Sequence, residues 1–208
     1  MHTRYIVRSI AHYRMNVVVK ILIISDFIGF LAIELCTPIF ALFVVDAIPN
    51  TDITVVGISA SLFLLSKSIF EVPIGMFIDK TRSEKDDLFF ACLGVLLIGI
   101  GYLCYIFIHS ISQLYILQIF LGFASAISYP GWCTIFTHHL DKGKEGFEWS
   151  MYDVLTGLGM AAAAALGGLI ASVFGFSFLF IIIFILSVLS ALLLLTISKQ
   201  IFLYKNKQ

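Results

Sequence analysis

Six apolar stretches, each long enough to cross a lipid bilayer as a helix, constrain this sequence more than any other feature. A hydrocarbon core of about 30 Å is crossed by about 20 residues, which rise about 1.5 Å each along a helix. Hydrophobic residues make up 60% of the 208 residues and charged residues 12%, a content that favours lipid over water. We therefore predict an all-α membrane protein, a single six-helix transmembrane domain over residues 1–208, with helices over approximately 21–45, 53–78, 88–108, 111–136, 151–174 and 176–197.

The positions of lysine and arginine predict the orientation of these helices. Basic residues of short connections stay on the cytoplasmic side of a membrane. All thirteen except Lys67 precede the first helix, follow the sixth, or lie in the second and fourth connections. The sequence therefore predicts an integral plasma-membrane protein with both termini in the cytoplasm. The first apolar run is too long for the core of a signal peptide, so we expect the N-terminus to be retained.

Composition and motifs argue against several other functions. The net charge is zero, so no basic surface for nucleic acid is indicated. The four cysteines lack metal-ligand spacing, and the motifs of serine hydrolases, zinc peptidases and phosphate-binding loops are missing. His138 and His139 stand beside Asp141 at the end of a predicted helix, where a solvated loop is a simpler interpretation than a metal site. We expect no cofactor, no metal and no enzymatic activity.

Four ionisable residues interrupt the apolar stretches: Asp26, Glu34, Lys67 and Glu71. Each costs about 2.5–3.5 kcal/mol to insert, so such groups usually face a bundle interior and have partners. Lys67 and Glu71 share one helical face, and Lys67 is roughly level with Glu34 across two helices. The residues form either a structural ion pair or the polar lining of a substrate or coupling path. Asp26 lies nearer the interface, where snorkelling or a helix-start role is an equal alternative.

Small residues and one proline predict close packing of the later helices. Small residues let membrane helices approach each other closely. Two interpretations stay open for the run in the fifth helix, namely tight packing and a moving interface in a transport cycle. Pro130 removes a backbone hydrogen bond and is expected to bend the fourth helix. The glycines concerned are Gly122, Gly157, Gly159, Gly167 and Gly168.

The connection between the second and third helices carries a specific motif. It reads Gly75-Met-Phe-Ile-Asp79-Lys80-Thr-Arg82-Ser-Glu-Lys85. It resembles the signature loop of the major facilitator superfamily, Gly-x-x-x-Asp-(Arg/Lys)-x-Gly-(Arg/Lys)-(Arg/Lys), although Arg82 stands where the family has its second glycine. Further similarity runs through Thr37-Pro38, Gly122 to Trp132 and Gly157 to Gly168, so the resemblance covers nearly the whole chain.

This resemblance implies the fold and function of the N-terminal half of such a transporter. Members pair two six-helix halves and bind their substrate between them at mid-depth. The chain would then move a small-molecule solute by alternating access, as a homodimer or with a second six-helix half in the lipid bilayer. Asp79 would help to close the cytoplasmic side by facing the positive end of a helix in the other half, with Lys80 and Arg82 anchoring the loop.

Two departures from the family pattern limit what the resemblance implies. Gln118 stands where many members carry an arginine of a proton relay, and Ala163-Ala164 replace the Gly-Pro of an antiporter motif. Neither a standard relay nor an exporter is therefore implied. Two other classes stay open: a non-transporting six-helix scaffold or assembly protein, which needs no water path to Lys67, and an intramembrane enzyme, which requires clustered catalytic groups.

Overall fold

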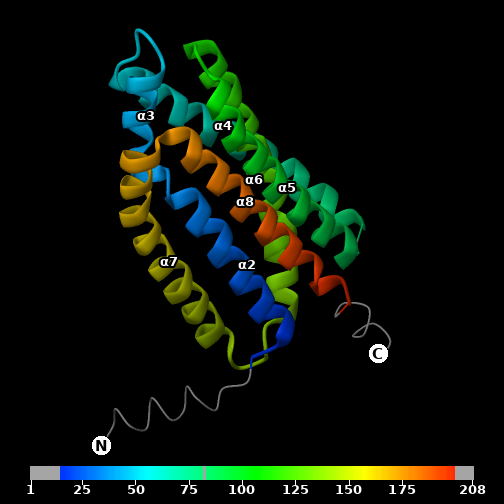
Figure 1. Ribbon diagram of the computed structural model, residues 1–208. Helices are drawn as coiled ribbons and strands as arrows, with labels where there is room; N and C mark the ends of the chain where they lie inside the picture. The colour runs from blue at the N-terminus through cyan, green and yellow to red at the C-terminus, as the bar shows by residue number, and fades with distance from the viewer. Residues whose placement is uncertain (1–14, 82, 200–208) are drawn as a thin grey trace, which may run out of the picture.

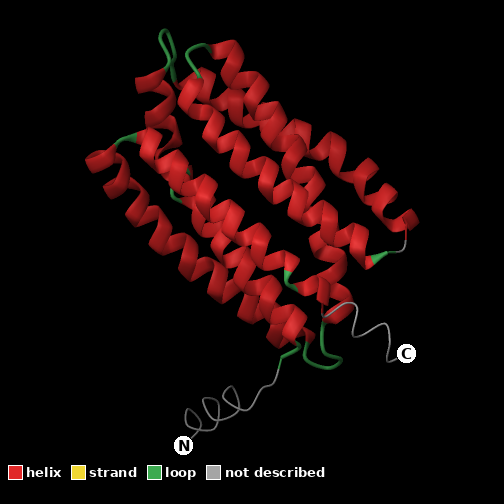
Figure 2. Ribbon diagram, turned by 45° about the vertical axis from the view of Figure 1, so that its right-hand side comes forward, coloured by secondary structure: helices red, strands yellow, loops and turns green. Residues whose placement is uncertain are grey.

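Six membrane-length helices form the molecule, and this confirms the predicted all-α six-helix fold. The computed structural model describes residues 15–81 and 83–199 (Figures 1 and 2). Within these residues, six helical segments are long and apolar enough to cross a membrane, and no strand is present. The elements are α2 (Val17–Glu34), η1 (Thr37–Ile39), α3 (Phe40–Ala47), α4 (Ile53–Thr81), α5 (Glu84–Cys104), η2 (Tyr105–Phe107), α6 (Ile111–His139), α7 (Glu145–Phe174) and α8 (Phe176–Leu195).

The first crossing is built from three elements rather than one regular helix. Helix α2 ends at Glu34, a 3-10 turn with Pro38 follows, and α3 completes the crossing. Proline has no backbone N–H and disfavours the α-helical conformation for the residue before it, which favours a break at this point. Thr37 bonds its own hydroxyl to the carbonyl of Ile33 at 3.2 Å, which partly compensates the lost helical bonds.

The helices divide into two groups of three. Helix α6 packs along both α4 and α5, whereas α2 packs along both α7 and α8 (Figure 1). The groups meet where α5 packs on α8 and where α2 contacts α6. Any space between the two groups therefore lies near the middle of the bundle and is lined by α2 and α6.

Two apolar clusters close the ends of the bundle. One is centred on Phe43, whose ring lies 4.8 Å from that of Phe180 and 5.6 Å from that of Tyr105. The other contains Trp132 and Phe136, whose rings stack at 4.8 Å. The clusters lie toward opposite ends of α2 and α6.

Some of the glycines predicted to pack helices do so, and others face open space. A Cβ atom on Gly122 of α6 would come within 2.8 Å of the Ser66 Cβ on α4, and one on Gly159 of α7 within 2.6 Å of the Phe27 ring on α2. A Cβ on Gly167 would likewise meet the backbone of Leu35. Gly157 and Gly168 have no neighbour within 4 Å of such an atom. Helices α4·α6 and α2·α7 therefore approach too closely for larger side chains at three positions.

The described chain begins and ends at the same end of the bundle. Helix α2 starts and α8 stops there, together with the α4–α5 and α6–α7 connections (Figure 2). Residues 48–52, 108–110 and 175 connect the helices at the other end. The assignment of the first end to the cytoplasm stays a prediction from the basic residues.

A cavity between the two helix groups

A cavity of about 270 Å³ lies where the two groups of helices meet. Residues of α2, α4, α5, α6, α7 and α8 all contribute to its wall. Two of them have ionisable side chains of opposite kind, Asp26 from α2 and Lys67 from α4. The rest of the wall is mainly aromatic and hydroxyl-bearing, and includes Phe30, Phe63, Ser125, Ser128, Tyr129, Trp132, Tyr152, Ser187 and Ser190.

Asp26 is held by a hydrogen bond that joins α2 to α7. The Tyr152 hydroxyl donates to Asp26 Oδ2 at 3.0 Å, and the carboxylate is half-buried. The backbone beside Asp26 is also fixed, because the Ser190 hydroxyl of α8 donates to the carbonyl of Ser25 at 2.8 Å. The carboxylate thus faces the cavity from a part of α2 that is hydrogen-bonded to both α7 and α8.

Lys67 faces the same cavity from the opposite group of helices. Its ammonium lies 4.0 Å from Glu71 Oε2 and 5.1 Å from the centre of the Tyr129 ring. Both contacts stabilise a cation in a partly desolvated place. Among the described residues, Lys67 forms no ion pair with Glu34, which also lies outside the lining of this cavity. Of the four ionisable residues noted in the sequence, the structure brings Asp26 and Lys67 to one cavity. Glu71 contacts Lys67 but does not line the cavity.

A second cavity of about 400 Å³ adjoins the first. The two share Ile33, Phe63, Ile98 and Ser125 as lining residues. The second cavity is also lined by Thr37, Tyr102 and Gln118, the glutamine at the place of the family's arginine. Together the two cavities follow α2 and α6 from the level of Asp26 toward the broken part of the first crossing.

The signature-loop residues lie away from these cavities. Asp79 and Lys80 are exposed near the end of α4, and Arg82 lies outside the described residues. Gly75 lies one turn earlier on α4, where an added Cβ would be 3.8 Å from the side chain of Pro130 on α6. The loop residues are therefore placed to contact something other than a solute in the cavity.

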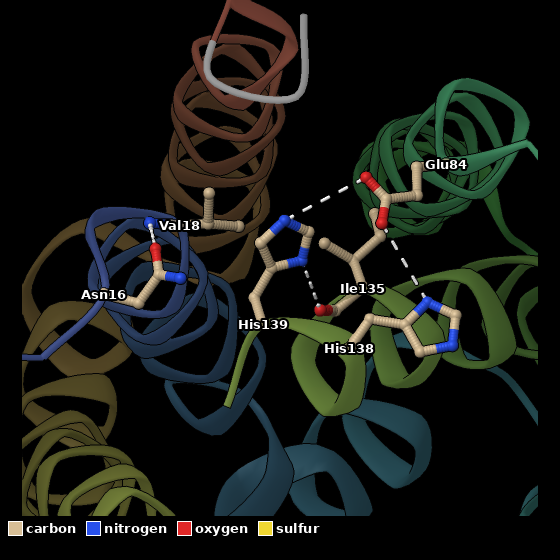
Figure 3. Close-up of polar contacts among 6 residues, drawn as sticks. All are labelled: Asn16, Val18, Glu84, Ile135, His138 and His139. Atoms are coloured by element: carbon tan, nitrogen blue, oxygen red, sulfur yellow. Dashed lines mark hydrogen bonds and ion pairs between the residues drawn. The ribbon is translucent and has the colours of Figure 1, made fainter. Parts of the chain in front are cut away.

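His138 and His139 lie at the same end of the bundle as the signature loop (Figure 3). The position of His139 corrects the predicted solvated loop. Helix α6 extends through His139, which is 5% exposed and therefore does not belong to a solvated loop. The His139 ring contacts the carbonyl of Ile135 at 3.0 Å and Glu84 of α5 at 3.9 Å, while His138 lies 3.9 Å from the same carboxylate. No cluster of three metal-ligating side chains occurs in the described part of the chain. Glu84 thus joins the start of α5 to the end of α6.

Sequence reasoning identified the charged residues of the cavity but not their neighbours. Tyr152 was not identified, because an aromatic residue near the end of a membrane helix is typical of the lipid interface. The four serines of the wall carried no signal in the sequence either. In the structure, three of them use their hydroxyls for hydrogen bonds to backbone carbonyls: Ser128 to Ala91, Ser187 to Ile183 and Ser190 to Ser25. Only the rotation of each helix about its axis decides which of these side chains reach the cavity.

Comparison with known proteins places this architecture in a family. The sequence model of the Major Facilitator Superfamily matches residues 22–201, so the chain belongs to that superfamily of membrane transporters. The solved structure of PepTSo, a POT family transporter, superposes with a TM-score of 0.75 at 16% sequence identity, over 90% of this chain and 38% of that one.

Two curated relatives are similar in sequence and differ in length. The uncharacterized MFS-type transporter MJ1560 of Methanocaldococcus jannaschii is 23% identical over 185 residues, which are 89% of this chain and 46% of that protein. The uncharacterized MFS-type transporter YitZ of Bacillus subtilis is 29% identical over 166 residues, 80% of this chain and 98% of that protein. The chain therefore spans about half the length of the first relative and nearly all of the second.

Proposed function

We propose that this chain forms one half of a secondary transporter that moves a small solute across the plasma membrane by alternating access. Membership of the superfamily supports transport, and the observation that carries the proposal is the pair of adjoining cavities along α2 and α6. The cavity nearer Asp26 holds opposite charges in an apolar bundle, which is typical of a substrate or ion path. A structural scaffold has no use for the Asp26 carboxylate, which faces a cavity without a basic partner among the described residues.

The second half of the transporter is proposed to be another copy of the chain or a separate six-helix protein. Superfamily members build their path between two halves related by an axis along the membrane normal. Helices α4 and α7 leave large apolar side chains exposed, such as Leu64, Ile69, Leu158 and Leu169. YitZ, of which the alignment covers 98%, supports a short working chain, whereas MJ1560 supports two halves in one polypeptide.

Asp79 is proposed to act as a latch between the halves and not as a contact to the solute. The residue is exposed at the end of α4, away from the cavities, as a group that engages another domain must be. A carboxylate there is stabilised by the positive end of a facing helix. Both termini are proposed to lie on this cytoplasmic side.

A single cysteine at Ser125 tests alternating access without knowledge of the solute. Ser125 lines both cavities, so Ser125→Cys reports on the path between them. Cys36, Cys92, Cys104 and Cys133 are first replaced, and membrane-impermeant thiol reagents are applied to oriented vesicles from one side at a time. We expect labelling from either side, and Asp79→Asn in the same background should increase labelling from the cytoplasmic side.

Ala163→Cys is the matched control, because Ala163 is fully buried within the helix packing. It should stay unlabelled from both sides in folded protein. Labelling of position 125 from one side only, or from neither, would contradict alternating access and favour the scaffold.

A further inference from the structure

We propose that the cavity at Asp26 binds a monovalent organic cation with an aromatic or apolar body, and that Asp26 is its counter-ion. This inference rests on the proposed transport function, since it names the class of solute that the path carries. It follows from the charge balance and the chemistry of the wall.

The two charged residues of the cavity differ in whether their charge is matched. Lys67 has a carboxylate partner, Glu71, at 4.0 Å. No lysine, arginine or histidine of the described residues lies within ion-pair distance of Asp26, whose hydrogen-bond partner is the neutral Tyr152 hydroxyl at 3.0 Å. Because Glu71 on the same helix matches the charge of Lys67, the Asp26 carboxylate is left at the cavity without a positive partner among the described residues.

This imbalance calls for a positive partner. Charged groups inside a membrane protein are retained when they are paired, because an isolated charge is costly to hold in an apolar environment. One positive charge would match Asp26, and it would lie at the side of the cavity that α2 and α7 form. A solute anion would instead add a second unmatched negative charge next to Asp26.

The wall also has the chemistry that recognises organic cations. Tyr129, Trp132 and Tyr152 line the cavity together with Phe30 and Phe63. Aromatic faces attract ammonium groups, most strongly where water is excluded. Lys67 already uses this property, since its ammonium lies 5.1 Å from the centre of the Tyr129 ring. The same rings provide apolar contact for the body of the solute.

The cavity is large enough for a small solute and offers few groups for a strongly hydrated one. Its volume is about 270 Å³, and three of its four serine hydroxyls are engaged with backbone carbonyls. A sugar or a polyvalent ion would need many free donors and acceptors. An amine or quaternary ammonium compound needs one carboxylate and apolar surface, which the cavity provides.

Two probes of equal shape and opposite charge test the proposal by binding alone. Benzyltrimethylammonium and phenylmethanesulfonate share a benzyl body and keep their charges at all working pH values. Binding to the full chain in lipid nanodiscs is measured by titration calorimetry. We expect the cation to bind at least about tenfold more tightly than the anion, a difference of about 1.4 kcal/mol. Equal affinities, or tighter binding of the anion, would overturn the proposal.

Variants then assign the effect to Asp26. Asp26→Asn should weaken binding of the cation by about tenfold or more, whereas Lys67→Met should tighten it, because it removes a positive charge from the cavity wall. Asp153→Asn is the matched control, since Asp153 is exposed on α7 and does not line the cavity. Undiminished cation binding in Asp26→Asn would overturn the assignment.

The wild-type comparison keeps the test decisive if Asp26→Asn fails to fold. Tyr152→Phe is then the second variant, because it keeps the ring, frees the carboxylate from its hydroxyl donor and should strengthen binding of the cation. Unchanged or weaker cation binding in folded Tyr152→Phe would contradict the role of Asp26. Selective cation binding without labelling of Ser125→Cys from both sides would refute transport alone, and two-sided labelling without cation selectivity would refute only the class of solute.

Discussion

Lys67 is the one basic residue of the sequence inside an apolar span, and its contacts set how much it contributes to stability. Lys67 and Glu71 are 33% and 29% exposed, and the ammonium and carboxylate are 4.0 Å apart. Ion pairs with this exposure are coupled by about 0.2–1 kcal/mol. We expect Lys67→Ala and Glu71→Ala each to lower the stability in detergent, and the double variant to lose less than the two losses added together.

Melting of the four proteins of this cycle measures the coupling. The loss in Lys67→Ala should exceed the coupling itself, because Glu71 is left without its cation and the Tyr129 ring without its contact. Strictly additive losses would show that Lys67 and Glu71 do not stabilise each other.

Trp132 contains a polar atom that nothing nearby satisfies. Its indole N–H is buried and has no acceptor among the described residues, while the ring stacks on Phe136 and contacts Tyr152 at 5.1 Å. We expect Trp132→Phe to change the unfolding free energy by less than about 1 kcal/mol, because the stacking stays and an unsatisfied donor is removed. Trp132→Ala should cost about 3–5 kcal/mol. Denaturation in detergent compares the two, and a loss well above about 1 kcal/mol in Trp132→Phe would contradict an unsatisfied N–H.

At the residue scale, the sequence singled out residue types that are rare in apolar helices and passed over common ones. Asp26 and Lys67 were conspicuous because charged groups are costly in apolar helices, and both line the cavity. The absence of an ion pair between Lys67 and Glu34 depends on the orientation of two helices, which equal depth alone does not determine. Tyr152 was missed because the sequence contains eight tyrosines and none is unusual by position.

At the scale of the helices, the length of each apolar run predicted the crossings, while their ends and one break depended on other properties. Helix α7 begins at Glu145 and α5 at Glu84, several residues before the predicted apolar starts. Polar first turns carry a helix out of the lipid, and hydropathy alone assigns them to loops. The break at Pro38 was hidden because the residues on both sides are apolar.

Close contact between α4 and α6 depends on the absence of a side chain at Gly122. A Cβ there would meet the carbonyl of Phe63 and approach the Ser66 Cβ to 2.8 Å. Ser66 also donates to the Ile119 carbonyl at 2.7 Å, a bond that forms only at this short distance between helices. We expect Gly122→Val to destabilise the chain by about 1–3 kcal/mol through overpacking.

Gly157→Val is the matched control for Gly122→Val. No atom lies within 4 Å of a Cβ at Gly157, so this change should alter the free energy of unfolding of the isolated chain by less than about 0.5 kcal/mol. Thermal unfolding in detergent provides both values. Equal losses of stability at the two positions would indicate that the effect of valine comes from the helix that carries it and not from packing between helices.

At the scale of the whole molecule, the proposed path along α2 and α6 requires a second set of helices as its opposite wall. The cavities lie between helix groups whose outer members, α4 and α7, contact each other little and expose large apolar side chains. A parallel pair of copies related by an axis along the membrane normal brings the same face of each to a common path. In that arrangement, Asp79 of one copy approaches the start of α7 in the other, near Met151.

The charges at the start of α7 are compatible with this contact. Glu148 is fully buried and accepts a hydrogen bond from the Asp141 backbone N–H at 3.0 Å, so its charge is directed into its own chain. The Lys144 Nζ lies 3.2 Å from Asp141 Oδ2 and offsets the negative charge of that carboxylate. Glu145 and Asp153 are the acidic residues left exposed in this part of α7, and the Glu145 carboxylate accepts a hydrogen bond from the Gly143 N–H at 3.0 Å. Asp79 of a facing copy would therefore approach the positive end of the helix beside these two carboxylates.

Crosslinking between two differently tagged copies tests the pairing. In a cysteine-free background, one copy carries Asp79→Cys and the other Met151→Cys, and both are co-expressed so that only a contact between copies gives a linked product. We expect a short bifunctional maleimide to link them in native membranes, and a pair with Gly175→Cys in place of Met151→Cys to stay unlinked, because Gly175 lies at the opposite end of α7. Native mass determination in lipid should show two copies. A monomer that carries solute when reconstituted at one copy per vesicle would rule out the two-copy unit, because a solute path formed between copies cannot exist in a single one.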